Sequence, residues 1–182
     1  MAKSEREVLV AGVGMVPFTK PSAGAAYDEM GSQAIRLALA DGGIDYADVE
    51  QAYAGYVYGD SCCGQRVAYQ VGLTGIPVFN VNNNCSTGST ALYLARQAIA
   101  SGAADCAIAV GFEQMTPGAL GATFTDRPNP FIDFDTVTDA LVDIELPLPS
   151  DISAERGFRT CGNMARPWRI LPRSATRRAV TP

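Results

Sequence analysis

Histidine is absent from all 182 residues of the chain. Because imidazole is the side chain that most often transfers protons near neutral pH, a mechanism that needs a histidine base is excluded for this chain alone. The five cysteines include no C-x-x-C pair. Without that spacing and without histidine, a zinc site is not expected, and we predict no metal.

Long apolar runs are also missing, so no membrane span is predicted. The N-terminus carries charges but no apolar stretch before a cleavage site, which gives no sign of a signal peptide. We therefore expect a cytoplasmic protein whose cysteines are reduced thiols. The net charge is −5, and we predict no nucleic-acid partner.

Charge is distributed unevenly along the chain. Residues 151–182 hold seven arginines and two acidic residues, whereas residues 1–150 hold seven basic and 17 acidic residues. Such a shift marks a boundary. Residues 150–182 are either an authentic basic tail or the product of a frameshift, which is our hypothesis.

Apolar segments alternate between strand-like and helix-like patterns over the first two thirds of the chain. Glycine pairs, prolines and polar clusters separate them. The expected strands are 6–18, 51–59, 77–82 and 104–113, and the expected helices are 27–44, 62–73 and 86–102. This β-α-β-α-β-α-β order predicts an α/β fold with a mostly parallel sheet and right-handed crossovers.

Cys85 stands where the third expected strand gives way to a helix, in the stretch "VFNVNNNCSTGST". Free N–H groups and the helix dipole at such an entry favour a thiolate and could stabilise an oxyanion. The small residues that follow leave room for a substrate carbonyl. The setting therefore suits acyl transfer through a thioester. The alternative is a small, buried, inert cysteine in a strand-to-helix turn.

Several segments resemble one family in order and spacing: "VNNNCSTGSTALYLARQAI", "VLVAGVGMVPFTKP", "GYVYGDSCCGQR", "GLTGIPVFNV" and "AVGFEQMTPGALG" with "FTDRPNP". They resemble thiolases, in particular the sterol-carrier-protein type and their bacterial lipid-transfer relatives. The resemblance implies the N-terminal half of the thiolase fold, a mostly parallel mixed sheet covered by helices. Residues 1–114 would form its core and 115–149 part of a loop region.

The resemblance also implies a function and a site. Cys85 would be the nucleophile of an acyl-CoA acyltransferase that cleaves or forms 3-oxoacyl-CoA, with coenzyme A as substrate and no bound cofactor. We expect acyl-CoA or CoA as ligands and a homodimer. The supporting residues would be Asn82, Asn83, Asn84, Ser86 and Gly88, with the asparagines capping the helix and satisfying backbone groups around the thiol; Met115 would line the acyl site.

Two departures from the family keep a second function open. A complete member is about twice as long, and its second half supplies the catalytic histidines and a second cysteine, which this chain lacks. The alternative is a non-catalytic half-thiolase that binds a partner or lipid through exposed faces. A ketoacyl synthase is disfavoured by the segments around Cys85.

Four further features have simpler interpretations. Gly12 and Gly14 fall short of a dinucleotide fingerprint and predict a tight turn after a core strand. The vicinal pair Cys62–Cys63 invites redox or metal chemistry, but packing is the simpler interpretation of Cys63, and Cys106 is expected in the core. For Arg66 an ion pair is favoured over an anion site.

Overall fold

The structure is a computed structural model, and it describes residues 6–116, 124–133 and 136. The chain divides into two compact units, Met1–Gly121 and Ala122–Pro182, and each is described by itself. The Arg-rich segment 150–182, with Cys161, and most of the expected loop region lie outside the described residues. Their proposed boundaries stay predictions.

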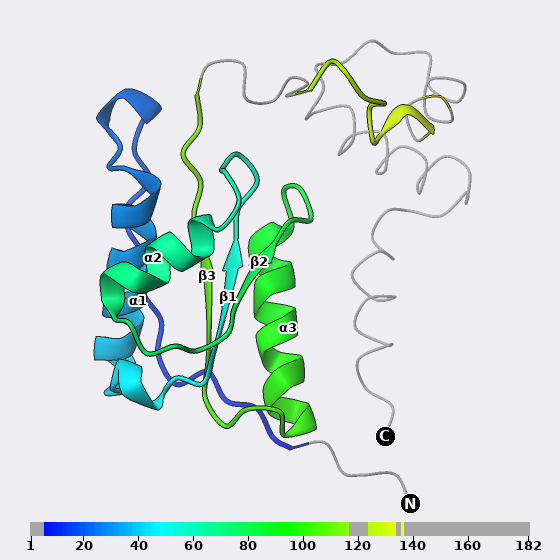
Figure 1. The fold of residues 1–182 in the computed structure, drawn as a ribbon. Coiled ribbons are helices and arrows are strands. Elements are labelled where there is room, and N and C mark those ends of the chain that lie inside the picture. The colour runs from blue at the N-terminus through cyan, green and yellow to red at the C-terminus, as the bar shows by residue number, and fades with distance from the viewer. Residues whose placement is uncertain (1–5, 117–123, 134–135, 137–182) are drawn as a thin grey trace, which may run out of the picture. The chain divides into compact units, whose positions relative to one another are not determined.

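The first unit alternates helices and strands (Figure 1). Its elements are η1 Pro21–Ala23, α1 Tyr27–Gly42, η2 Tyr46–Asp48, β1 Gln51–Gly55, α2 Cys63–Val71, β2 Val78–Val81, α3 Thr87–Ser101 and β3 Ala107–Gly111. Both long helices end at a glycine in the left-handed region, Gly43 with φ 62° and Gly102 with φ 76°. Glycine adopts this conformation without a steric penalty, which explains why α1 and α3 stop there.

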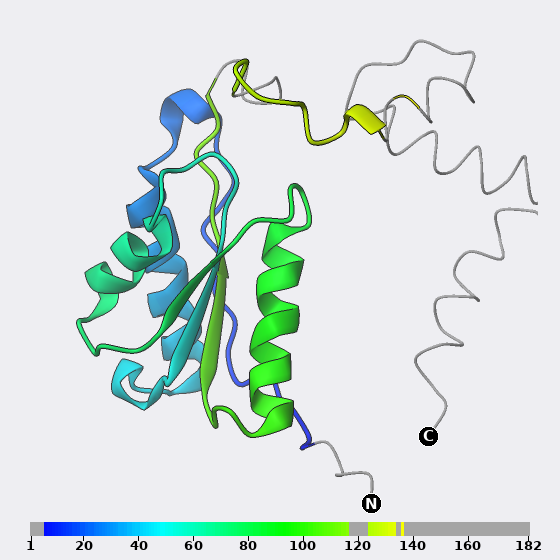
Figure 2. The same ribbon diagram turned by 45° about the vertical axis from the view of Figure 1, so that its right-hand side comes forward.

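The three strands form one parallel sheet in the order β2-β1-β3. Tyr53 in the middle of β1 pairs in register with Phe79 on β2 and with Ala109 on β3. Helices α1 and α2 cover one face of the sheet and α3 covers the other (Figures 1 and 2). The prediction of a parallel, doubly covered α/β layer is confirmed.

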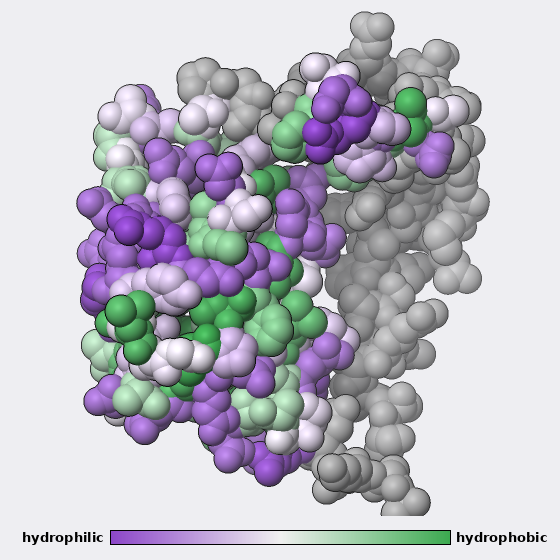
Figure 3. Space-filling model, in the orientation of Figure 1, coloured by the Kyte–Doolittle hydropathy of each residue, from purple (hydrophilic) through white to green (hydrophobic). Residues whose placement is uncertain are grey.

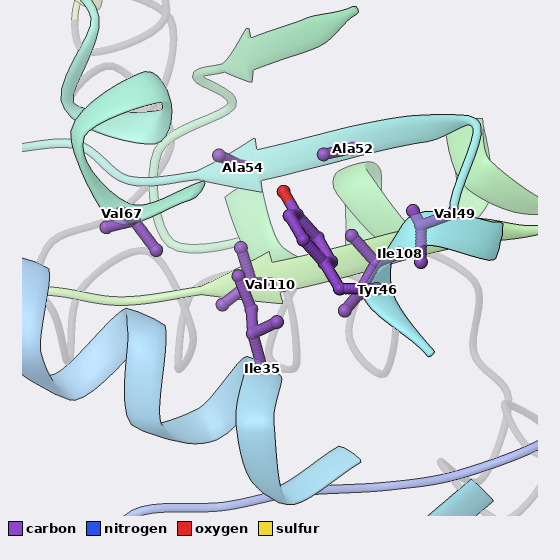
Figure 4. Packing of buried hydrophobic residues seen from close by; sticks show 8 residues of the cluster. All are labelled: Ile35, Tyr46, Val49, Ala52, Ala54, Val67, Ile108 and Val110. Carbon is purple, nitrogen blue, oxygen red and sulfur yellow. The ribbon is translucent and has the colours of Figure 1, made fainter. Parts of the chain in front are cut away.

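The core lies on both faces of β1. Towards α1 and α2 it is built from branched and aromatic side chains, which converge in Figure 4. Towards α3 it consists of Tyr53 and small residues, among them Ala91, Ala95 and Ala98. Because alanines let the helix approach the strands closely, α3 is held tightly against the end of the sheet where Cys85 lies.

The prediction of a strand at residues 6–18 is wrong. This segment has no strand partner among the described residues and runs along α1 instead. A Cβ on Gly12 would lie 2.3 Å from the Ala38 carbonyl oxygen, and the N–H of Val13 donates to the Asp41 carboxylate at 2.9 Å. The glycines thus allow a close approach of two backbones, and the predicted tight turn is not what they form.

The described part of the second unit is short and local. The Asp126 carboxylate holds the Arg127 guanidinium by two hydrogen bonds of 2.8 and 2.9 Å. The same guanidinium lies 4.2 Å from the centre of the Phe124 ring. These contacts are local and exposed, and they join residues at most three apart in sequence.

Two features are absent from the residues that the structure describes. In that part of the chain no helix is both long and apolar enough to cross a membrane. The same residues contain no group of three or more His, Cys, Asp or Glu side chains that could hold a metal ion.

Candidate functional site

The connections that follow β1 and β2 lie on opposite faces of the sheet. The chain leaves β1 towards α2 on one face, and it leaves the neighbouring strand β2 towards α3 on the other face (Figure 2). The loops after two such strands diverge and leave a crevice at the carboxyl edge of the sheet. In open α/β sheets this is where ligands bind.

Cys85 lies at that edge, between β2 and α3. Its side chain is exposed, so the alternative of a buried cysteine is wrong, and the reactivity of the thiol stays a prediction. The thiol makes one weak hydrogen bond, to Asn84 Oδ1 at 3.8 Å. Asn84 has a φ of 47°, a left-handed conformation that asparagine tolerates better than most residues.

The asparagine triplet forms a turn, and the prediction that its side chains cap α3 is wrong. The N-cap is Ser86, without a side-chain cap bond. The backbone carbonyl groups of Asn83 and Asn84 accept the N–H groups of Ser86 and Thr87 at 3.2 and 3.0 Å. The turn is therefore closed by backbone groups, and the asparagine side chains make other hydrogen bonds. Asn82 Oδ1 accepts the Asn84 N–H at 3.2 Å, and this bond satisfies a backbone group beside Cys85 as predicted.

The side chain of Thr87 holds this turn by two hydrogen bonds. Its hydroxyl donates to the Asn84 carbonyl at 2.6 Å and accepts the Asn83 N–H at 2.8 Å. The side chain is only 4% exposed and packs against Gly55 at the end of β1. Thr87 therefore fixes the turn that carries Cys85, although the sequence alone did not single it out.

Gly88, three residues after Cys85, leaves open space at the first turn of α3. A Cβ at this position would meet nothing within 4 Å. The N–H groups of Gly88 and Ser89 have no hydrogen-bond acceptor among the described residues. Two free donors beside open space can bind an oxyanion or a carbonyl oxygen.

A cavity of about 180 Å³ opens in the crevice itself. Four of its lining residues come from the β1–α2 loop and three from the end of β2: Tyr56, Val57, Gly59 and Ser61, and Asn80, Val81 and Asn82. The cavity thus joins the loop after β1 to the residues that lead into Cys85. Of the predicted site residues, only Asn82 lines it.

Cys63 and Arg66 take ordinary structural roles. Cys63 is buried at the start of α2, which fits the packing interpretation, whereas Cys62 is exposed with a φ of 68°. Arg66 donates to the Asp28 carboxylate at 2.9 Å, so the predicted ion pair is confirmed. Met115 is half-buried beyond β3, and its role at an acyl site stays a prediction.

Burial and nearby charge both act on the Cys106 thiol. Burial raises the pKa of the Cys106 thiol, and the carboxylates of Asp48 and Glu50 raise it further. Cys106 lies before β3 at the opposite edge of the sheet and is half-buried, in partial agreement with its predicted place in the core. A protonated, shielded thiol there does not take part in the chemistry of Cys85.

Comparison with known proteins identifies the class. The family model described as "Thiolase, N-terminal domain" matches residues 8–145. This match covers most of the chain and ends before residues 150–182. The chain belongs to the thiolase family.

Two curated relatives illustrate the range. Sterol carrier protein 2 of Gallus gallus is 56% identical over 128 residues, which cover 69% of this chain and 23% of that protein. The benzoylsuccinyl-CoA thiolase subunit BbsB of Thauera aromatica is 37% identical over 116 residues, or 63% of this chain and 30% of that subunit. This chain therefore spans about a quarter of the length of the relatives it matches.

A solved structure agrees in fold. The acetyl-CoA acetyltransferase from Syntrophomonas wolfei superposes with a TM-score of 0.51 at 22% identity, over 55% of this chain and 27% of that one. At this identity the likeness shows the fold alone. It confirms that β1, β2, β3 and their helices form the thiolase-type α/β layer.

Proposed function

We propose that this chain carries the nucleophilic half of a thiolase-type acyltransferase, with Cys85 as the acyl acceptor and an acyl-coenzyme A as substrate. The observation that carries the proposal is the exposed Cys85 thiol at the β1–β2 crevice, at the entry of α3. The family membership and the names of the relatives support acyl-CoA as the substrate class.

The chemistry needs few groups for its first step. The Cys85 thiolate adds to the thioester carbonyl of the acyl-CoA, and the negative charge develops on the carbonyl oxygen. The free N–H groups of Gly88 and Ser89, at the start of α3, are candidates to receive that charge. Collapse of the intermediate breaks the bond between the acyl carbon and the sulfur of CoA, and the acyl group stays on Cys85.

Cleavage of a 3-oxoacyl-CoA needs more than this chain contains. The carbon–carbon bond that breaks leaves a carbanion, which must be protonated by a general acid. No histidine exists in the chain to do this. We therefore expect acylation of Cys85 by the chain alone, and thiolytic turnover only when another polypeptide supplies the acid and base.

The test is to incubate the protein with acetyl-CoA and measure the acyl adduct and released CoA by mass spectrometry. One acetyl group on Cys85 and one equivalent of CoA are expected, with neither in Cys85→Ser. The matched control is Cys62→Ser, which removes another exposed thiol and should acylate normally. An unmodified Cys85 in a folded protein would reject the proposal.

Association is a second candidate role, and exposed apolar residues favour it. Leu9, Val10, Val13, Met15 and Phe18 are each at least two thirds exposed in the segment along α1. Apolar side chains also reach the surface where β2 forms the edge of the sheet (Figure 3). Soluble proteins rarely leave such surfaces uncovered. We therefore expect a homodimer or another association in solution.

A further inference from the structure

Glu113 lies just beyond β3 and is not one of the site residues described above. Its carboxylate contacts the β1–α2 loop, which lines the cavity. We propose that Glu113 is a positioning residue that holds the β1–α2 loop in place as one wall of the cavity that Asn82, three residues before Cys85, also lines. In this way it controls how a coenzyme A-linked ligand reaches the thiol. The ligand class rests on the proposed function, whereas the positioning of the loop does not.

The Glu113 carboxylate binds the loop with both oxygens. Oε2 accepts the N–H of Val57 at 2.9 Å, and Oε1 accepts the N–H of Tyr58 at 3.0 Å. These bonds are partly buried and charge-assisted, and such bonds are stronger than neutral ones. The loop has no strand partner for these two N–H groups, so the carboxylate replaces a sheet neighbour.

The residues around Glu113 fasten the start of the same loop. The N–H of Phe112 donates to the Gly55 carbonyl at 3.1 Å. The Phe112 ring stacks on Tyr56, with ring centres 5.2 Å apart and an angle of 13°. Because aromatic stacking and the two carboxylate bonds act on successive residues, positions 56–58 are fixed from the β3 side.

The loop residues that are fixed from the β3 side also line the cavity. Tyr56 and Val57 line it from one side, and Asn80 and Asn82 line it from the other. The N–H of Tyr56 also donates to the Val81 carbonyl at 3.3 Å, which joins the loop to the end of β2. A displaced loop would therefore change the cavity that Asn82 lines, while the turn that carries Cys85 keeps its own anchor, Thr87.

The opposite edge of the sheet offers a matched control. The Glu50 carboxylate accepts the N–H of Asp105 at 2.7 Å, just before β1 and β3 begin. Glu50→Gln removes the same charge from one exposed bond at the amino edge, whereas Glu113→Gln removes it from two partly buried bonds at the carboxyl edge. Glu50→Gln therefore shows what the loss of a carboxylate does when the β1–α2 loop is not touched.

The experiment measures three quantities in the wild type, Glu113→Gln and Glu50→Gln. The first is hydrogen exchange at the amides of Val57 and Tyr58. The second is the rate at which iodoacetamide, a small reagent, alkylates Cys85. The third is the concentration dependence of the reaction with coenzyme A disulfide, in which the Cys85 thiolate forms a mixed disulfide and releases one CoA thiolate.

In Glu113→Gln we expect exchange at the two amides to be about tenfold faster, since one amide then faces an NH₂ group and loses its acceptor. The half-saturating concentration of coenzyme A disulfide should rise by at least about fivefold, and alkylation by iodoacetamide should stay within about twofold. Glu50→Gln should change none of these. Glu113→Asp, which keeps both oxygens, is the second variant if Glu113→Gln unfolds, and it should fall between the two.

Unchanged exchange at Val57 and Tyr58, or an equal loss of coenzyme A disulfide binding in Glu50→Gln, overturns the inference. Acylation of the wild type by acetyl-CoA tests the proposed function separately. If that acylation fails, the exchange and disulfide measurements still decide the role of Glu113.

Discussion

Gly55 and Thr87 are in such close contact that the end of β1 has no room for a side chain. A Cβ on Gly55 would lie 2.8 Å from Thr87 Cγ2 and 2.9 Å from the Thr87 carbonyl oxygen. Since Thr87 holds the turn that carries Cys85, the absence of a single methyl group in β1 sets the position of the nucleophile.

Gly55→Ala should therefore destabilise the protein and disturb the site. The backbone of α3 would have to shift, which costs about 1–3 kcal/mol in the free energy of unfolding. Chemical denaturation measures this loss, and slower acylation of Cys85 should accompany it. Stability equal to that of the wild type would mean that the contact is looser than described.

Gly88→Ala is the matched glycine-to-alanine change, next to Thr87 in the first turn of α3. It should stabilise the protein, whereas Gly55→Ala should destabilise it. Its new Cβ meets nothing within 4 Å, and alanine favours a helix over glycine by up to about 1 kcal/mol. The methyl group would occupy the open space at the start of α3, where the acyl group is proposed to bind, so acylation should slow while the protein becomes more stable. Faster acylation, or a loss of stability, would contradict the proposed use of that space.

The sequence predicted the order of elements well because glycine pairs and apolar periodicity bound each one. It failed at residues 6–18, where "VLVAGV" has strand composition. Whether such a segment enters a sheet depends on a partner strand, which local composition does not report. Along α1, Gly12 and Gly14 permit a close backbone contact that favours the helix surface over a strand edge.

At the site, the position of Cys85 was predictable and the residues that hold it were not. The place of the thiol between a strand and a helix follows from local pattern, whereas its exposure came from the structure. Thr87 acts on backbone groups of the turn just before it, whereas Glu113 acts on backbone groups of another loop, 56 residues away in sequence. The available signal was a polar residue directly after a parallel strand, and Glu113 fits it, since it follows β3 by two residues.

Asp28 links α1 to α2 and should make stability depend on pH. The hydrogen bond from Arg66 lowers the pKa of the Asp28 carboxyl group below its ordinary value. A lowered folded-state pKa gives stability that is present above the unfolded value, near 4, and is lost as pH falls through the folded one. Because the Arg66 side chain is 63% exposed, we expect no more than about 1 kcal/mol.

Asp28→Asn should lower the free energy of unfolding at pH 7 and have little effect at pH 2. The control is Glu29→Gln, which removes a neighbouring charge from the same first turn of α1 and leaves the Arg66 bond intact. An equal pH dependence in both variants would assign the effect to the helix dipole instead of the ion pair.

The cysteines should react with iodoacetamide in an order set by exposure and charge. Cys62 and Cys85 are exposed, whereas burial and two nearby carboxylates raise the pKa of Cys106. At pH 7 we expect Cys106 to be labelled last among these three, and its rate should keep rising as pH increases beyond 9 because more thiolate forms. Peptide mapping by mass spectrometry after timed quenching measures this order. Early labelling of Cys106 would show that the amino edge of the sheet opens readily.

The exposed segment along α1 should drive association if it is the uncovered surface. Leu9 and Met15 are 77% and 70% exposed, so replacing both by glutamine removes apolar surface at little cost to folding. We expect the double variant to shift the protein towards monomer in sedimentation velocity at micromolar concentration. Leu73, which is 81% exposed before β2, is the control, and Leu73→Gln should leave the distribution unchanged. A shift caused by Leu73→Gln instead would move the contact to the β2 edge, whereas a monomeric wild type would refute the association altogether.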